Sequence, residues 1–416
     1  MTATRTAPVR RPRSARLSGP RLLIILASVL VFLSAIRVMT GADDISSSGT
    51  FNAALALAVP IGLAGLGGLW SERAGVVNIG LEGMMILGTW GAGFFGYQWG
   101  PWAGVLGAVA RGAVGGLLHA VATVTFGVDH IVSGVAINIL GLGATQYLAA
   151  VAFTGKPGGG ETQSPSVEDL PSLSFPGAGR PLGDLEAEHW FVVSDLAAVL
   201  RSLVVDVNVL TIIAVGLFVL TWYLLWRTPF GLRLRSCGES PVAAESLGVN
   251  VYRYKYVAVL TSGALAGLAG AFLAIVASSA FRDGQTGGRG YIGLAAMIFG
   301  NWRPGGLGAG AGLFGYTNAL QLRQGGQSVH ALLLVVAVLV VALAVWQLRR
   351  GLSRSAAAAG VVGLLVFLWY LVTDEVPEDF TRVTPYVATL LVLALASQRL
   401  RMPAADGQVY RRGEAG

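Results

Sequence analysis

The chain has 416 residues, of which 54% are hydrophobic and only 12% are charged, and its formal net charge is +7. A soluble domain carries about 25% charged residues, so this composition excludes an ordinary soluble protein and indicates a polytopic membrane protein. Arginine at the ends of apolar segments supplies nearly all of the positive charge, which predicts membrane topology and no nucleic-acid partner, and the single cysteine, Cys237, excludes an internal disulfide and a cysteine-based metal cluster.

Apolar segments recur along the whole chain. A helix needs about 20 such residues to cross the roughly 30 Å of hydrocarbon in a bilayer. This criterion predicts an all-α transmembrane bundle with helices at residues 21–40, 52–70, 76–97, 101–126, 131–153, 208–226, 257–280, 291–300, 306–322, 331–348, 356–373 and 383–398. The segment 291–300 is too short to cross alone and precedes the break NWRPGG. We therefore expect either a half-helix beside a translocation path or a purely structural kink there.

The loops differ in charge. Residues 1–21 contain six arginines and no acidic residue, and arginines also concentrate in 227–256, 348–355 and the tail, whereas 374–380 is acidic. Cytoplasmic loops are enriched in Arg and Lys. We therefore predict a multi-pass protein of the cell membrane with both termini in the cytoplasm. It would comprise a basic tail at 1–20, a transmembrane domain at 21–398 and a second tail at 399–416.

One loop, residues 154–207, is unusually long. It begins Gly/Pro-rich, as GKPGGGETQSPS, and continues with many acidic residues. Parity of the crossings places it outside the cell, and its later part, WFVVSDLAAVLRSLVVDVN, is a candidate for a helix lying on the outer face. A loop of this length is either functional or a flexible connector.

The segment SERAGVVNIGLEGMMILG, residues 71–88, places polar groups inside an apolar region. Asn78 and Glu82 are four residues apart, which predicts one shared helix face. Intramembrane acids usually face the bundle interior or a wet cavity. Glu82 is therefore either part of a conduction path or a tertiary hydrogen-bond anchor. Arg111 lies deep in its own apolar segment, and we expect it to contact Glu82, another buried acceptor or an aqueous cavity.

Motifs of catalysis are missing from the chain. Neither lysine belongs to a Gly-Lys-Ser/Thr phosphate-binding loop, and neither HExxH nor GxSxG occurs. The four histidines sit on separate segments without the spacing of metal ligands. The sequence therefore predicts no enzyme, no metal site and no cofactor held by this chain.

The most distinctive stretch is the loop 228–256, TPFGLRLRSCGESPVAAESLGVNVYRYKY. It is polar and basic, and it lies between two long apolar segments. Pro241 suits the first position of a helix and Gly248 suits the residue that ends one, so a short helix is predicted from Pro241 to Leu247. A single well-patterned cytoplasmic loop among tight turns indicates a surface that contacts another protein.

Four stretches carry a resemblance to a known family: SERAGVVNIGLEGMM, DHIVSGVAINILGLG, the loop just described and the tail TPYVATLLVLALASQRLRMPAADGQVYRRGE. They resemble the permease subunits of bacterial ABC importers of the branched-chain amino acid and ribose type, and most of all those for nucleosides and simple sugars. The resemblance covers residues 52–322 and 384–414. It implies about ten family-type spans. Residues 331–373 then form an extra helical pair, and the loop 154–207 is enlarged.

The resemblance also implies a function, which is to form half of the translocation path of an ATP-driven importer. The implied partners are an ATPase subunit that binds the ATP, a second homologous permease, an extracellular substrate-binding protein and the membrane lipid. The implied coupling residues, which would dock in a groove of the ATPase, are Glu239, Pro241, Ala243, Ala244, Glu245, Gly248 and Val249.

The polar residues expected near the path or its gates are Asn52, Asn78, Glu82 and Asn138. Two other functions stay open at the level of the sequence. An ATP-independent secondary transporter or channel would place paired ionisable residues at the midplane of the membrane. A non-transporting scaffold would have no use for polar helix faces.

Overall fold

The computed structural model describes residues 19–323, 325–377 and 400–413, and this part of the chain is almost entirely helical. Its long helices are α1 (Gly19–Thr40), α2 (Ser48–Arg73), α3 (Leu81–Trp99), α4 (Pro101–Ala120), α5 (His130–Phe153), α8 (Val209–Arg227), α11 (Val251–Ala271), α13 (Pro304–Leu322), α14 (Gly325–Arg349) and α15 (Ser353–Val372). The shorter helices are α6 (Gly179–Ala187), α7 (Val193–Val204), α9 (Pro229–Glu239), α10 (Pro241–Ser246) and α12 (Arg289–Phe299). Three short helical segments, η1 (Asp43–Ser46), η2 (Val121–Thr125) and η3 (Phe272–Ala277), and two paired strands, β1 (Ser172–Leu173) and β2 (Val207–Asn208), complete it.

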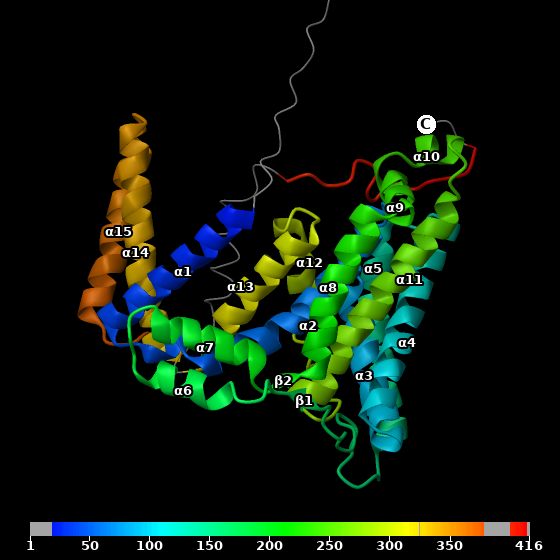
Figure 1. Ribbon diagram of the computed structural model, residues 1–416. Coiled ribbons are helices and arrows are strands. Elements are labelled where there is room, and N and C mark those ends of the chain that lie inside the picture. The colour runs from blue at the N-terminus through cyan, green and yellow to red at the C-terminus, as the bar shows by residue number, and fades with distance from the viewer. Residues whose placement is uncertain (1–18, 324, 378–399, 414–416) are drawn as a thin grey trace, which may run out of the picture.

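The centre of the molecule is a bundle in which α2, α3, α4 and α11 pack against one another (Figure 1). The helices α9 and α10 lie at one end of this bundle, together with residues 400–413. Toward the opposite end, the helices α6 and α7 lie to one side of this bundle, and α7 packs against α2 and α1. In the described residues seven helices are long and apolar enough to cross a membrane, so the chain is a multi-pass membrane protein.

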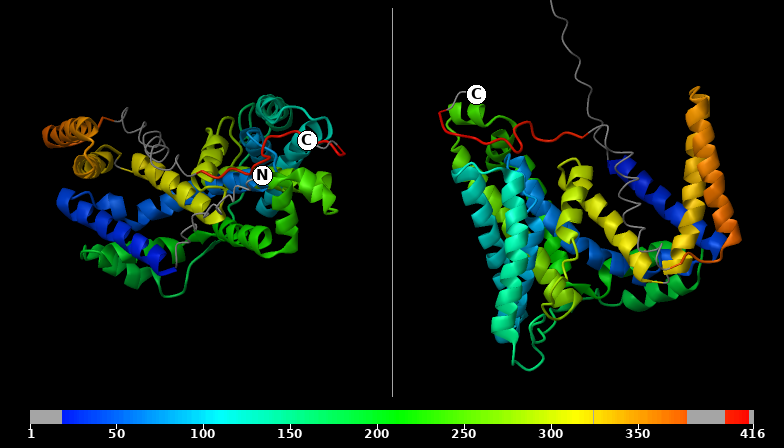
Figure 2. Two further views of the ribbon diagram at one scale, coloured as in Figure 1. Left: turned by 90° about the horizontal axis from the view of Figure 1, so that it is seen from above. Right: turned by 180° about the vertical axis from the view of Figure 1, so that it is seen from behind.

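The pair α14 and α15, which covers the predicted extra segment 331–373, stands at the side of the bundle (Figure 2). The two helices pack mainly on each other and touch the remainder through α13 and α1. The pair is therefore an addition to the periphery, and the central packing does not depend on it.

Close approach of helices at glycine holds the central bundle together. A Cβ atom on Gly267 of α11 would lie 2.2 Å from the carbonyl oxygen of Ala108, and one on Gly263 would lie 2.3 Å from that of Gly112. Only glycine allows two backbones to come this near, as is common between helices in membranes. The apolar side chains that fill the space between these helices include Leu63, Leu66, Met85 and Phe272, all fully buried.

Most predicted segments coincide with helices to within a few residues, but two differ. The segment 383–398 lies outside the described residues. The segment 76–97 does not begin as a helix, because residues 74–80 form an irregular buried connection and α3 starts at Leu81. The prediction that Asn78 and Glu82 share a helix face is therefore wrong. The Oδ1 atom of Asn78 accepts a hydrogen bond from the backbone N–H of Gly80 at 3.0 Å, a local turn that competes with helix formation.

Candidate functional site

The short helix α10 is formed by local sequence signals. Pro241 occupies its first position, and the chain leaves the helix at Gly248, whose φ of +80° is in the left-handed region. The N–H of Gly248 donates to the carbonyl of Glu245 at 2.8 Å, and that of Val249 donates to Ala244 at 3.0 Å. The predicted helix with a proline start and a glycine end is confirmed.

The predicted coupling residues do not all face outward. Ala244 is 2% exposed and packs with Cys237, Val251 and Tyr410 in the interior of this end of the molecule. It is therefore unavailable to a partner in this arrangement, because it lies on the inner side of α10. The exposed side chains are Val242, Ala243, Ser246 and Leu247.

Other predicted coupling residues hold α10 in place. The carboxylate of Glu239 pairs with Arg73 at 3.8 Å and accepts from the backbone N–H of Ala404 at 3.4 Å. The carboxylate of Glu245 pairs with the Nε of Arg412 at 3.3 Å. Pro241 and Val249 are half-buried. These contacts tie the end of α9 to the end of α2, and α10 to the C-terminal segment.

A contributor that the sequence reasoning missed is the C-terminal segment, residues 400–413. It runs across this end of the bundle beside α9, α10 and the start of α11 (Figure 1). The N–H of Ala405 donates to Gly238 at 2.8 Å, and the ring of Tyr410 lies 5.5 Å from that of Tyr252. The family resemblance of this tail was the one available signal, but it carries no information about which surface the tail covers.

The C-terminal segment also buries a carboxyl group. Asp406 is 8% exposed, and this burial raises the pKa of its carboxyl to about 7, although Glu72 and Lys255 beside it oppose the shift. Glu72 in turn accepts a hydrogen bond from the indole Nε1 of Trp302 at 2.5 Å. The carboxyl groups of Asp406 and Glu72 therefore lie close to each other where the tail covers the end of α2.

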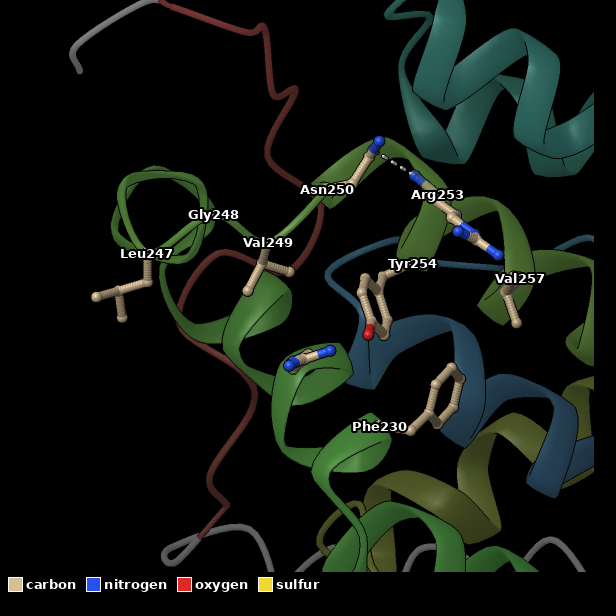
Figure 3. Close-up of a pocket in the computed structure, with 9 residues that line it drawn as sticks. Phe230, Leu247, Gly248, Val249, Asn250, Arg253, Tyr254 and Val257 are labelled. Carbon is tan, nitrogen blue, oxygen red and sulfur yellow. Dashed lines mark hydrogen bonds between the residues drawn. The ribbon is translucent and has the colours of Figure 1, made fainter.

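A cavity of about 450 Å³ opens next to α10 (Figure 3). The rings of Phe230 and Tyr254 form its floor, with centroids 5.3 Å apart, and Leu247 stands at its rim, pointing away from it. Its basic side chains, Arg233 and Arg253, form no ion pair with any other described residue. The recess thus combines aromatic surface with two uncompensated positive charges.

A second group of predicted residues meets deeper in the bundle, at the start of the short helix α12. The carboxylate oxygens of Glu82 accept hydrogen bonds from the backbone N–H groups of Gly288 at 2.8 Å and Gly290 at 2.7 Å. A carboxylate at a helix N-terminus satisfies N–H groups that have no partner within the helix and complements the helix dipole. Glu82, at 6% exposure, therefore holds the beginning of α12 in the bundle.

Asn138 of α5 joins this group. Its Oδ1 accepts from the N–H of Gly83 at 2.7 Å, while its Nδ2 donates to the carbonyl of Ile79 and to the hydroxyl of Tyr291, both at 2.9 Å. One side chain thus connects α5, the start of α3 and α12. The segment 291–300, for which the sequence allowed either a half-helix beside a path or a kink, is the short helix α12. It is hydrogen-bonded to α5 through Asn138 and to α3 through Glu82.

Asn78 is fully buried in the same region, and its Nδ2 donates to the hydroxyl of Ser262 on α11 at 2.9 Å. Leu81 packs on Gly67 and Gly68 of α2. Gly67 lies six residues before Arg73, the last residue of α2, which is about 9 Å along the helix at 1.5 Å per residue. Asn52, in contrast, is exposed near the beginning of α2 and is not brought to this group.

Arg111 and Glu82 do not meet. The guanidinium of Arg111 lies over the ring of Trp90, 5.0 Å from its centroid, and its side chain crosses Gly91. Gly91 is nine residues beyond Glu82 on α3, a rise of about 13 Å. Of the contacts expected for Arg111, the one with Glu82 is therefore wrong, because Arg111 makes a cation–π contact with the buried ring of Trp90 on the adjacent helix.

Comparison with known proteins identifies the family of this chain. A family model described as the permease component of the branched-chain amino acid transport system matches residues 50–345. The guanosine ABC transporter permease protein NupQ of Bacillus subtilis is 34% identical over 87% of this chain and 96% of its own length. The nucleoside ABC transporter permease protein NupC of Lactococcus lactis is 32% identical over 86% of this chain and 94% of its own.

A third relative is the putative glucose ABC transporter permease protein TsgC13 of Haloferax volcanii. It is 34% identical over 88% of this chain and 98% of its own length. No solved structure matches the chain.

Proposed function

The chain belongs to the family of permease components of branched-chain amino acid transport systems, and on that premise we propose that it is the membrane subunit of an ATP-driven importer for a nucleoside or a simple sugar. The family is one of transport components, not of enzymes. The substrate class is supported by relatives named for guanosine, nucleosides and glucose, each matched over nearly its full length.

The observation that carries coupling to an ATPase is the exposed face of α10. Leu247 is 85% exposed on a helix whose inner side is firmly packed, and the cavity with Arg233 and Arg253 lies beside it. An exposed apolar side chain at the rim of a basic recess fits a partner groove that offers apolar surface and acidic side chains. The partner ATPase would bind the ATP, so this chain needs no cofactor of its own.

The remaining partners follow from the division of labour in such an importer. A second homologous permease would complete the path, and an extracellular substrate-binding protein would deliver the solute to the end that carries α6 and α7. The group around Glu82 would hold the half-helix α12 beside the path. Both oxygens of Glu82 are engaged by main-chain N–H groups, which favours an anchor over a residue that binds the solute.

Uptake by whole cells tests the function. Cells that contain this chain with its ATPase and binding protein should accumulate labelled guanosine or glucose. A matched ATPase variant that cannot hydrolyse ATP should abolish accumulation. Accumulation that persists with the inactive ATPase and follows an ion gradient would instead establish a secondary transporter.

The proposed orientation places α10 and both termini in the cytoplasm and α6 outside. Asp184→Cys on α6 and Ser246→Cys on α10 both put a thiol at an exposed position. In intact cells, an impermeant maleimide should label the first and spare the second until the cells are permeabilised. The reverse pattern would overturn the orientation.

Native Cys237 is unsuitable for this test. It is fully buried, and burial raises the pKa of its thiol to about 11. It should therefore stay unlabelled from either side of the membrane. Labelling of the Asp184→Cys and Ser246→Cys variants then reports only the introduced thiol.

A further inference from the structure

The helix α7 buries its small and polar side chains and exposes its apolar ones, which is the reverse of a surface helix in a soluble protein. Its buried positions are small or polar: Ser194, Asp195, Ala197, Ala198 and Ser202. Its exposed face is a ridge of apolar side chains, between 43% and 54% exposed: Val193, Leu196, Leu200 and Leu203. We call these four residues the apolar ridge. Their spacing of three and four residues places them on one side of the helix.

The polar face of α7 is held by a buried ion pair. Asp195 is 2% exposed and accepts a hydrogen bond from the Nη2 of Arg37 on α1 at 3.3 Å. The hydroxyl of Ser46 also donates to Asp195. A buried carboxylate with these partners fixes the rotation of α7, so the outward direction of the apolar ridge is set by the structure.

The start of α7 lies beside the body of α1 and not beyond its end. The N–H of Val192 donates to the hydroxyl of Ser34 at 2.8 Å. Ser34 precedes Thr40, the last residue of α1, by six positions, which is about 9 Å along the helix. Trp190 and Phe191, each more than half exposed, come immediately before this contact. This part of the chain therefore lies beside the apolar segment Ala27–Thr40 of α1 and not beyond its end.

The packing partners of α7 leave one side of the helix free. The helix α6 packs along α7 on the side away from the bundle, while α2 and α1 contact it from the other (Figure 1). Seen along the bundle, α6 and α7 lie at the edge of the molecule (Figure 2). Neighbouring exposed residues of α1, including Phe32, Val38 and Met39, are also apolar.

We propose that α7 is an interfacial helix whose apolar ridge lies among the acyl chains of the outer leaflet of the membrane. The ridge has no hydrogen-bonding or charged side chain with which a hydrophilic partner could pair, and α1, which contacts α7, also exposes apolar side chains. Tryptophan at its start is typical of the boundary between headgroups and hydrocarbon. The enlarged loop 154–207 would then be held against the outer leaflet through α7. The choice of leaflet rests on the proposed orientation, whereas the contact with lipid does not.

Spin labels distinguish lipid from water and from protein at this helix. Leu196→Cys, Leu200→Cys and Leu203→Cys are each labelled in the full chain in lipid nanodiscs, with Asp184→Cys on the exposed side of α6 as the control. Collision with oxygen, which concentrates in hydrocarbon, is compared with collision with a water-soluble nickel chelate.

The ratio of oxygen to nickel collisions should be severalfold higher at all three ridge positions than at residue 184. A high nickel accessibility would show that the ridge faces water and overturn the proposal. Low accessibility to both, with immobilised labels, would show a protein covering the ridge and overturn it equally. Thermal melting of each variant checks that it is folded. Because three ridge positions are labelled, the test can still be read if one of the variants fails to fold. None of these outcomes depends on transport, so they are separable from a failure of the proposed function.

Discussion

Replacement of Leu247 by glutamate is expected to abolish ATP-driven uptake while the chain stays folded and inserted. Leu247 is 85% exposed at the end of α10, so the change removes no internal contact. If the side chain enters a groove of the ATPase, burial of an unpaired carboxylate replaces burial of apolar surface. Losses at such central interface positions are about 2 kcal/mol or more, roughly a 30-fold weakening of the complex. Uptake and co-purification of the ATPase measure the effect.

A matched control for Leu247→Glu is Val409→Glu in the C-terminal segment. Val409 is 47% exposed and lies at the same end of the molecule, but it is outside α10. This variant should bind the ATPase and transport as the wild type does. Normal uptake by Leu247→Glu, at normal expression, would contradict the assignment of α10 as the coupling helix.

Replacement of Glu82 by leucine is expected to lower the stability of the protein in detergent strongly. It leaves the buried N–H of Gly290 and the half-buried N–H of Gly288 without their acceptors. An unsatisfied buried group costs about 1–3 kcal/mol, so a loss of at least about 1–3 kcal/mol is expected from Gly290. Glu82→Gln keeps one carbonyl oxygen as an acceptor and should lose less. Thermal melting measures both variants, and uptake should fall in the same order.

A double-mutant cycle with Arg111 provides the control for this second prediction. Arg111 stacks on Trp90 and does not contact Glu82, so the losses of Arg111→Ala and Glu82→Gln should add. A coupling between the two substitutions would show that they interact. Melting of Glu82→Leu at the wild-type temperature would contradict the role of Glu82 as the anchor of α12.

The sequence by itself determined the class of the fold, the positions of most membrane helices and the short helix α10. Long apolar runs must become helices in a bilayer, because every backbone polar group needs an internal partner there. The ends of α10 were equally readable, since Pro241 and Gly248 act through their own backbone angles. Signals of this kind are local and do not depend on what packs nearby.

Only the tertiary structure decided which side each residue faces. In a chain this apolar, hydropathy does not distinguish a face against lipid from a face against another helix. The inward position of Ala244, the stacking of Arg111 on Trp90 and the outward ridge of α7 were therefore not predictable. The hydrogen bonds of Gly288 to Glu82 and of Trp302 to Glu72 join segments more than 200 residues apart. Such contacts arise because buried polar groups must find partners wherever the packing of the helices places them.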